Sequence, residues 1–309
     1  MLRSRLICVA VLGPLALGAC FRGGSSDGAA AGGARGRAPG GSGDELAFLP
    51  VDAELVVGLD ARQILASPLW RHFQPRIMKW IGKSVQDFRA ACGYDPLAAL
   101  RGMTLGIKLA EPIDGVFVVR GLPRDQTIAC VGRALAQTQL KIEGGIITVP
   151  GDGPGNLPAV MAFADATTLV IATSRGGLDA ALAAGAPLRR SRAFSELWAL
   201  VDARRAMWGI VNGAARAFDS LSALGVRPRA VFGSVGLAGG LSLTGRMRLG
   251  TPDEATQLAS LGQAQAGALQ SMADKVEVGA DGPDVTLHVE LTAEQIDSLA
   301  GIALQMWRF

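Results

Sequence analysis

An internal repeat is the feature of this sequence that most constrains its fold. The segment Thr168–Ala183, "TLVIATSRGGLDAALA", aligns without gaps with Thr286–Gly301, "TLHVELTAEQIDSLAG". Both segments begin with a strand-like apolar run, which is followed by a short polar stretch and then by a helix-like pattern. Such self-similarity predicts that the chain contains two copies of one supersecondary unit.

The residues at the two expected helix starts agree with this alignment. Ser174 and Thr292 occupy equivalent positions, and the side-chain oxygen of each can accept a hydrogen bond from a free N–H group of the following helix. Gln295 follows Thr292 at the spacing of a capping box. We therefore predict that a helix begins directly after each of these two capping residues.

Weaker parallels extend the repeat toward the N-terminus. "LPRDQT" from Leu122 and "TPDEAT" from Thr251 each place a proline near the start of a predicted helix. Each of those helices precedes a strand that begins Lys-x-Glu, at Lys141 and at Lys275. The offsets differ between these pairs, so the first copy must contain insertions.

Short runs rich in Val, Ile and Thr predict strands that are separated by turns and by helical stretches. Hairpins that alternate with helices favour an α+β fold over a doubly wound parallel sheet. We therefore expect two duplicated units, 45–186 and 187–309, each a mostly antiparallel sheet with helices packed on one face. The expected strands are "ELVVGLD", "MTLGIKL", "GVFVVRG", "GGIITVP", "AVMAFAD" and "TLVIATS", and the expected helices of the first copy are 62–81, 125–140 and 175–184.

The N-terminus has the layout of a secretory signal. Arg3 and Arg5 precede an apolar run, Leu6 to Leu17, and small residues follow it. The run is too short to cross a bilayer, which takes about 20 apolar residues. One reading is an ordinary secretion signal that is cleaved after an Ala-x-Ala-like site.

The second reading rests on Leu17-Gly18-Ala19-Cys20, which resembles the lipobox of bacterial lipoproteins. That resemblance implies that residues 1–19 are a signal peptide, and that cleavage leaves Cys20 as a lipidated N-terminus. It also implies a cell-envelope protein that faces the periplasm and is attached to a membrane through the lipid on Cys20. Phe21 stands where Asp often retains such proteins at the inner membrane, so the outer membrane is expected.

Composition separates a tether from the folded body and argues against nucleic-acid binding. Residues 20–44 are dominated by Gly, Ala, Ser and Arg, which predicts a flexible tether. The formal net charge of the chain is only +3 and aromatic residues make up 5%. The chain therefore offers neither the basic excess nor the stacking platforms of a nucleic-acid partner.

Two cysteines, Cys92 and Cys130, remain after Cys8 leaves with the signal and Cys20 is lipidated. In an exported protein two remaining thiols favour a disulfide. The alternative is a pair of buried free cysteines. The chain has no C-x-x-C pattern, and its two histidines, His72 and His288, lie far apart in sequence, so we expect no metal site and no cofactor.

A search for catalytic motifs favours structural readings. Gly82-Lys83-Ser84 resembles the end of a phosphate-binding loop, but Ile77 stands where the motif requires glycine. Asp60, which ends a predicted strand before a helix, is interpreted as a helix cap. So is Asn212, which follows Trp208-Gly209-Ile210-Val211 much as Asp60 follows Val57-Gly58-Leu59. Ser234 is interpreted as a strand residue. We therefore expect no enzymatic activity.

The segment Phe48–Phe73, "FLPVDAELVVGLDARQILASPLWRHF", is similar to a pattern found in uncharacterised bacterial envelope lipoproteins. The resemblance extends through "CGYDP" from Cys92 and to Cys130, and it implies location and architecture but no activity. The sequence thus predicts a non-enzymatic binding or structural module of the cell envelope. An envelope protein is one possible partner. The alternatives are a carrier of a lipophilic ligand in an apolar cavity, and an enzyme whose site would be a cleft of convergent carboxylates.

Overall fold

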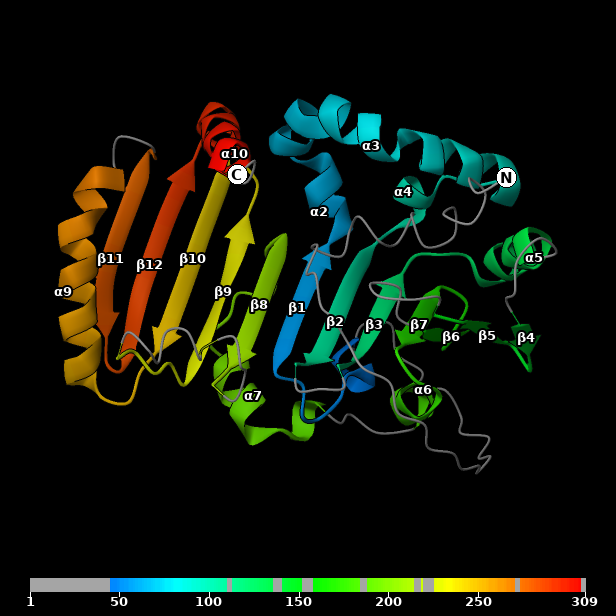
Figure 1. The fold of residues 1–309 in the computed structure, drawn as a ribbon, viewed down its shortest axis with the longest axis horizontal. Helices are drawn as coiled ribbons and strands as arrows, with labels where there is room; N and C mark the ends of the chain where they lie inside the picture. Colours follow the sequence, from blue (N-terminus) through cyan, green and yellow to red (C-terminus); the bar gives the residue numbers. More distant parts are fainter. Residues whose placement is uncertain are drawn as a thin grey trace. The chain divides into compact units, whose positions relative to one another are not determined.

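The computed structural model describes residues 45–109, 113–135, 141–151, 158–183, 188–213, 218, 225–269 and 273–306. These residues form an α+β fold of two compact units, in which the strands pair in the antiparallel sense (Figure 1). Unit 1 contains the described residues up to Ala53 together with Gln74–Ser191, and unit 2 contains Glu54–Phe73 and the residues from Arg192 onward. The predicted signal peptide, Cys20 and the tether lie outside the described residues.

The sheet of unit 1 has the strand order β2-β3-β7-β6-β5-β4. Its first hairpin, β2 with β3, is followed by helix α5, and the later strand β7 then pairs with β3. Five of these strands were predicted from apolar runs in the sequence. The bounds are β2 Gly102–Lys108, β3 Asp114–Arg120, β4 Lys141–Glu143, β5 Ile146–Val149, β6 Ala159–Phe163, β7 Thr168–Ala172, α5 Arg124–Leu135 and α6 Arg175–Leu182.

One face of this sheet is closed by helix α6 and by the segment that follows η1 (Glu45–Phe48). Val118 and Val170, which are paired across β3 and β7, have no exposed surface. A Cβ atom on Gly106 would lie 3.2 Å from Cβ of Leu49, so the chain after η1 presses directly against β2. Burial of such branched side chains contributes about 1.5–3 kcal/mol each.

The helical stretch predicted at 62–81 consists of two helices, α2 (Ala61–Ala66) and α3 (Pro68–Cys92). The break falls at Ser67 because Pro68 has no N–H group to continue the first helix but fits the first turn of the next. Near the end of α3, Cys92 is joined to Cys130 of α5 by a disulfide whose Cα atoms are 4.7 Å apart. The short helix α4 (Pro96–Ala99) follows.

The sheet of unit 2 has the strand order β11-β12-β10-β9-β8-β1. Its hairpin β9 with β10 is followed by helix α9, and the later strand β12 pairs with β10. The segment Glu54–Phe73 lies in this unit because β1 pairs with β8. The bounds are β1 Leu55–Asp60, α7 Arg192–Trp198, β8 Met207–Asn212, β9 Ala230–Gly236, β10 Leu241–Arg248, α9 Pro252–Leu269, β11 Lys275–Asp281, β12 Asp284–Leu291 and α10 Ala293–Met306.

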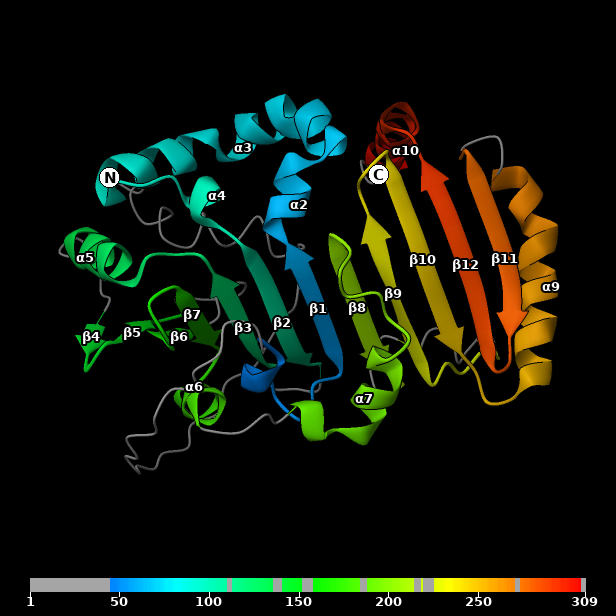
Figure 2. The same cartoon turned by 180° about the vertical axis from the view of Figure 1, so that it is seen from behind.

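The two faces of the unit 2 sheet are built differently. Helix α9 lies along β11 in both views (Figures 1 and 2), and its buried Ala266 belongs to a cluster that Leu287 and Val289 of β12 pack against. On the other face, α7 covers β8 through an edge-to-face contact between Trp198 and Trp208. Apolar packing therefore stabilises unit 2 on both faces, but over different strands.

An ion pair closes the end of the β10–β12 ladder. Asp284, whose side chain is 3% exposed, accepts hydrogen bonds from Arg248 at 2.7 and 3.0 Å. The Arg248 guanidinium also stacks over the ring of Phe232. The hydrogen bond to Asp284 raises the pKa of Arg248 above its usual value, so the guanidinium stays charged. Among the described residues, no helix is both long enough and apolar enough to span a bilayer.

Candidate functional site

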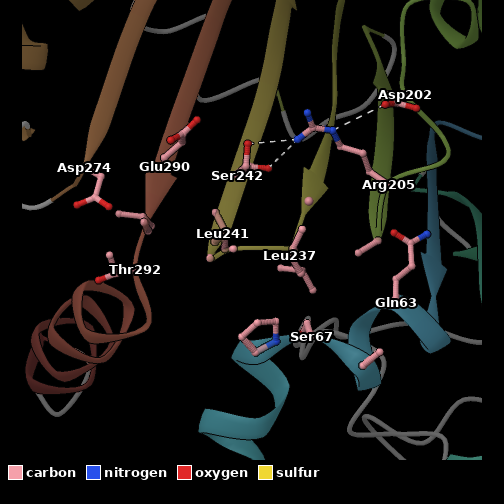
Figure 3. Close-up of a pocket in the computed structure, with 18 of the residues that line it drawn as sticks. Gln63, Ser67, Asp202, Arg205, Leu237, Leu241, Ser242, Asp274, Glu290 and Thr292 are labelled. Atoms are coloured by element: carbon pink, nitrogen blue, oxygen red, sulfur yellow. Dashed lines mark hydrogen bonds and ion pairs between the residues drawn. The ribbon is translucent and has the colours of Figure 1, made fainter.

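A groove of about 900 Å³ opens where the strands of unit 2 end (Figure 3). It lies next to the end of β9, the start of β10 and the end of β12, and the turn that joins α2 to α3 forms another side. All of its lining residues belong to unit 2. They are Gln63, 66–68, Asp202, 204–206, 236–242, Asp274 and 290–292.

The middle of the groove is apolar and is shaped by the glycine-rich loop 236–240. Leu237 and Leu241 point into it in Figure 3, and Ala206, Ala66 and Leu291 also line it. The loop lies close against β12, with the positive φ of 157° at Gly240. A Cβ atom at this position would come within 2.6 Å of a β12 carbonyl oxygen, so only glycine fits.

One side of the groove carries a network around Asp202. Its carboxylate accepts a hydrogen bond of 2.9 Å from Nε of Arg204, and Nε of Arg205 lies 3.8 Å away. The hydrogen bond from Arg204 lowers the pKa of Asp202 below its ordinary value. Arg205 is held in place by Ser242, because its Nη1 donates to the Ser242 carbonyl oxygen at 3.3 Å and to the Ser242 hydroxyl at 3.2 Å.

The opposite side of the groove is acidic (Figure 3). Asp274 accepts a hydrogen bond of 2.9 Å from the side chain of Gln295, which also accepts from the N–H of Thr292 in the capping box of α10. Glu290, 48% exposed, lies 2.8 Å from Nε2 of His288. Both carboxylates keep oxygen lone pairs for a donor in the groove, since each oxygen can accept more than one hydrogen bond.

The hydroxyl groups of the groove already make structural contacts. Ser67 donates to the Ile64 carbonyl at 2.7 Å and accepts from the Trp70 N–H at 3.0 Å, so it joins α2 to α3. Ser242 accepts from Arg205. Among the contacts of the described residues, neither serine is hydrogen-bonded to a histidine.

The structure shows some of the residues singled out from the sequence, and others lie outside the described ranges. Cys92 and Cys130 are buried in unit 1, and the disulfide expected between them is present. Cys20 lies outside the described residues. Asp60 is the N-cap of α2, accepting from the N–H groups of Arg62 at 3.0 Å and Gln63 at 3.1 Å. Residues 214–217, which directly follow Gly213, are outside the described ranges, so the capping role predicted for Asn212 is not visible.

His288 and Ser234 both lie in strands of unit 2, as predicted for Ser234. His288 faces away from Leu287 and Val289, which pack toward α9, and its side chain is 26% exposed. Ser234 lies within β9 and is 4% exposed. The described residues contain no group of three histidine, cysteine or carboxylate side chains arranged to hold a metal ion.

Sequence reasoning did not identify the groove. The two carboxylates of its acidic side, Asp274 and Glu290, come from the ends of different strands and have no shared motif. The run "GLAGGLS" from Gly236 is the one local signal, because several glycines between two strands indicate a loop that lies close to other backbone. Comparison of the chain with protein-family models, with curated proteins and with solved structures finds no match.

Proposed function

We propose that this protein is a non-enzymatic binding module of the bacterial cell envelope, and that the groove of unit 2 holds a short segment of a partner protein. The observation that carries the proposal is the groove's composition, an apolar middle with an acidic side and a side that carries arginines. Such pockets combine apolar contact area with a few placed charges that fix orientation.

The chemistry of the groove defines the segment that fits it. A leucine-sized side chain would contact Leu237 and Leu241, and a neighbouring lysine or arginine would reach Asp274 and Glu290. A wholly apolar molecule would leave these carboxylates without water or a counter-charge, which is costly. The proposed ligand is therefore a peptide with a basic residue beside an apolar one, in preference to the alternative of a lipophilic cargo.

Fluorescent probe peptides test this proposal. Peptides with a central leucine flanked by lysine, by serine or by glutamate are titrated against the full chain. The lysine peptide should bind tightest, and Glu290→Gln and Asp274→Asn should each weaken it by roughly tenfold, the value of one charge-assisted hydrogen bond. Glu277→Gln is the matched control, because Glu277 is 61% exposed on β11 and does not line the groove.

Three results would reject the peptide proposal. One is equal affinity for the lysine and glutamate peptides, and a second is equal weakening by Glu277→Gln. The third is a mass bound to the gently purified protein, seen by native mass spectrometry and removed by organic solvent, together with no peptide binding. That last result would favour the lipophilic carrier.

The lipid anchor on Cys20 is a separate part of the proposal. It is supported by the lipobox-like sequence and by the position of that sequence directly before a glycine-rich stretch. Two or more acyl chains hold a protein firmly on a bilayer, at about 0.8 kcal/mol per buried methylene. Cys20→Ala should release the protein from the outer-membrane fraction, and a variant that stays bound would show that lipid is not the anchor.

We also propose that units 1 and 2 arose by duplication. In each unit a hairpin, a helix and a later strand occur in the same order, and the later strand pairs with the second strand of the hairpin. Arg120 pairs with Thr168 just as Arg246 pairs with Thr286. The caps also correspond, since Ser174 accepts from an N–H three residues later and Thr292 does the same.

A further inference from the structure

We propose that the outer face of helix α3 docks on an anionic lipid bilayer. This outer face consists of Arg76, Lys79, Trp80 and Lys83, all of them exposed residues of unit 1. The inference goes beyond the proposed ligand of the groove, because it concerns a different surface and a different partner.

The spacing of the helix places these four residues together. The opposite side of α3 is turned inward, with Val85 and Cys92 buried. Residues three and four positions apart are neighbours on a helix surface, so Arg76 and Lys83 flank Trp80. Between Gln74 and Gln86 the helix carries three basic residues and no acidic one.

Among the described residues, Trp80 is the most exposed of the large apolar side chains, at 83% of its surface. A tryptophan side chain usually buries a large apolar area in a protein core or at an interface, and an exposed one does not. The ammonium group of Lys79 has no partner among the described residues. Lys83 is 85% exposed and is paired only with Asp87 on the same helix, a surface contact worth little.

A lipid surface suits this composition better than a protein or a nucleic acid. Tryptophan is enriched at the headgroup level of bilayers, where lysine and arginine beside it meet lipid phosphates. Protein interfaces are depleted in lysine, yet two of the three bases here are lysine. A net charge of +3 over the whole chain does not favour binding to nucleic acid.

Few contacts are available, so this face alone binds weakly. Each basic residue near an anionic surface adds about one tenfold step or less in affinity. A chain held at the membrane by another attachment needs no strong second contact, because tethering raises the effective concentration of the helix at the surface. The proposal nevertheless does not require that attachment, and it can be tested without it.

The test uses the full chain with Cys20→Ala and vesicles of phosphatidylcholine with or without phosphatidylglycerol. Lys79→Gln/Lys83→Gln should lower binding to the anionic vesicles by roughly tenfold, and Trp80→Ala by about threefold or more. Arg175→Gln/Arg192→Gln removes the same charge from exposed sites elsewhere, and Leu261→Ala removes another exposed apolar side chain. Neither control should change binding.

Quenching by brominated lipid reads the position of Trp80 directly, whatever holds the chain on the vesicle. The parent should lose tryptophan fluorescence on brominated anionic vesicles, and Trp80→Phe should lose much less. Equal quenching of both proteins would overturn the proposal. So would equal binding by the α3 variants and their controls, or binding that is the same with and without phosphatidylglycerol.

Discussion

Two strand pairs at equivalent places in the two units have opposite environments. In unit 1, Val118 faces Val170 across β3 and β7, and neither has any exposed surface. In unit 2, Thr244 faces His288 across β10 and β12, where the histidine side chain is 26% exposed and the threonine is exposed. The same strand order therefore supports an apolar interior in one unit and a polar surface in the other.

The position of the covering helix explains the difference. Helix α6 packs on β3, β6 and β7 of unit 1, with Leu178 fully buried. In unit 2, α9 packs on β11 and β12, and it contacts the opposite face, where Leu287 and Val289 lie. Because side chains alternate along a strand, the uncovered face of β12 carries polar residues and leads to the groove at Glu290.

The largest expected effect comes from exchanging the residues of the two environments. Val170→His should destabilise unit 1 by about 4 kcal/mol or more, because a ring with two polar nitrogens replaces a fully buried valine. The mirror change His288→Val should alter the stability of unit 2 by about 0.5 kcal/mol or less. Denaturant unfolding measures both, and equal costs would show that the two environments are alike.

Loss of the Cys92–Cys130 bond should have the next largest effect, and it should destabilise unit 1 alone. The bond spans 38 residues, which in the loop-entropy treatment corresponds to about 4 kcal/mol as an upper value. Cys92→Ala/Cys130→Ala should expose the amides of α5 to hydrogen exchange while those of β12 keep their protection. Equal loss of protection in α5 and in β12 would mean that the two units unfold as one.

The ion pair of Asp284 offers the corresponding test in unit 2. Asp284→Asn should cost about 3 kcal/mol, since it leaves the Arg248 charge three-quarters buried without its partner. Glu277→Gln is the control, because it breaks a pair with Lys275 in which Glu277 is 61% exposed and should cost under about 0.5 kcal/mol. A small effect of Asp284→Asn would show that solvent reaches Arg248 freely.

Much of this architecture could be predicted from sequence because its signals are local. Apolar runs located β1 to β3 and β5 to β7, and the equivalent caps Ser174 and Thr292 located the starts of α6 and α10. The α+β class followed from the alternation of hairpins and helices. The disulfide followed from a count of cysteines, which is a constraint on the whole chain.

Features that depend on pairing between distant segments were not predictable. The Lys-x-Glu strands β4 and β11 look equivalent in sequence, yet β4 pairs with β5 whereas β11 pairs with β12, next to the central strand β10. The sequence could not show which face α9 would cover. The groove depends on both facts, because Glu290 is accessible only where the polar face of β12 is uncovered.

The two caps give a smaller test of the proposed duplication. Ser174→Ala and Thr292→Ala should each lower the free energy of unfolding by about 1 kcal/mol, because each removes the acceptor for an N–H in the first helical turn. Replacement by Asp should restore most of the loss. Circular dichroism during denaturation measures both changes, and a cap that matters in one unit only would argue against equivalent helix starts.

The smallest effect concerns pH and compares two aspartates that accept backbone N–H groups, Asp60 at the start of α2 in unit 2 and Asp165 in the turn between β6 and β7 in unit 1. Burial raises the pKa of Asp60, but the hydrogen bonds from Gln63 and from the N–H of Arg62 outweigh it, so its pKa lies below the ordinary 3.8. Asp165 behaves alike through the N–H groups of Thr167 and Thr168. A lowered folded pKa means that the unfolded chain binds more protons in this range. The stabilisation is therefore present above about pH 4 and is lost as the pH falls through the folded value.

The Asn variants separate this protonation effect from simple loss of the cap. Asp60→Asn keeps an acceptor for the first turn of α2, so stability near neutral pH should change by about 0.5 kcal/mol or less. The variant should lose part of the decline that the parent shows between about pH 5 and pH 3. Asp165→Asn should do the same in unit 1. The measurement is the free energy of unfolding as a function of pH. Curves that superimpose for the parent and both variants would mean that neither carboxylate contributes to the decline in stability, because its pKa would then be the same in the folded and the unfolded chain.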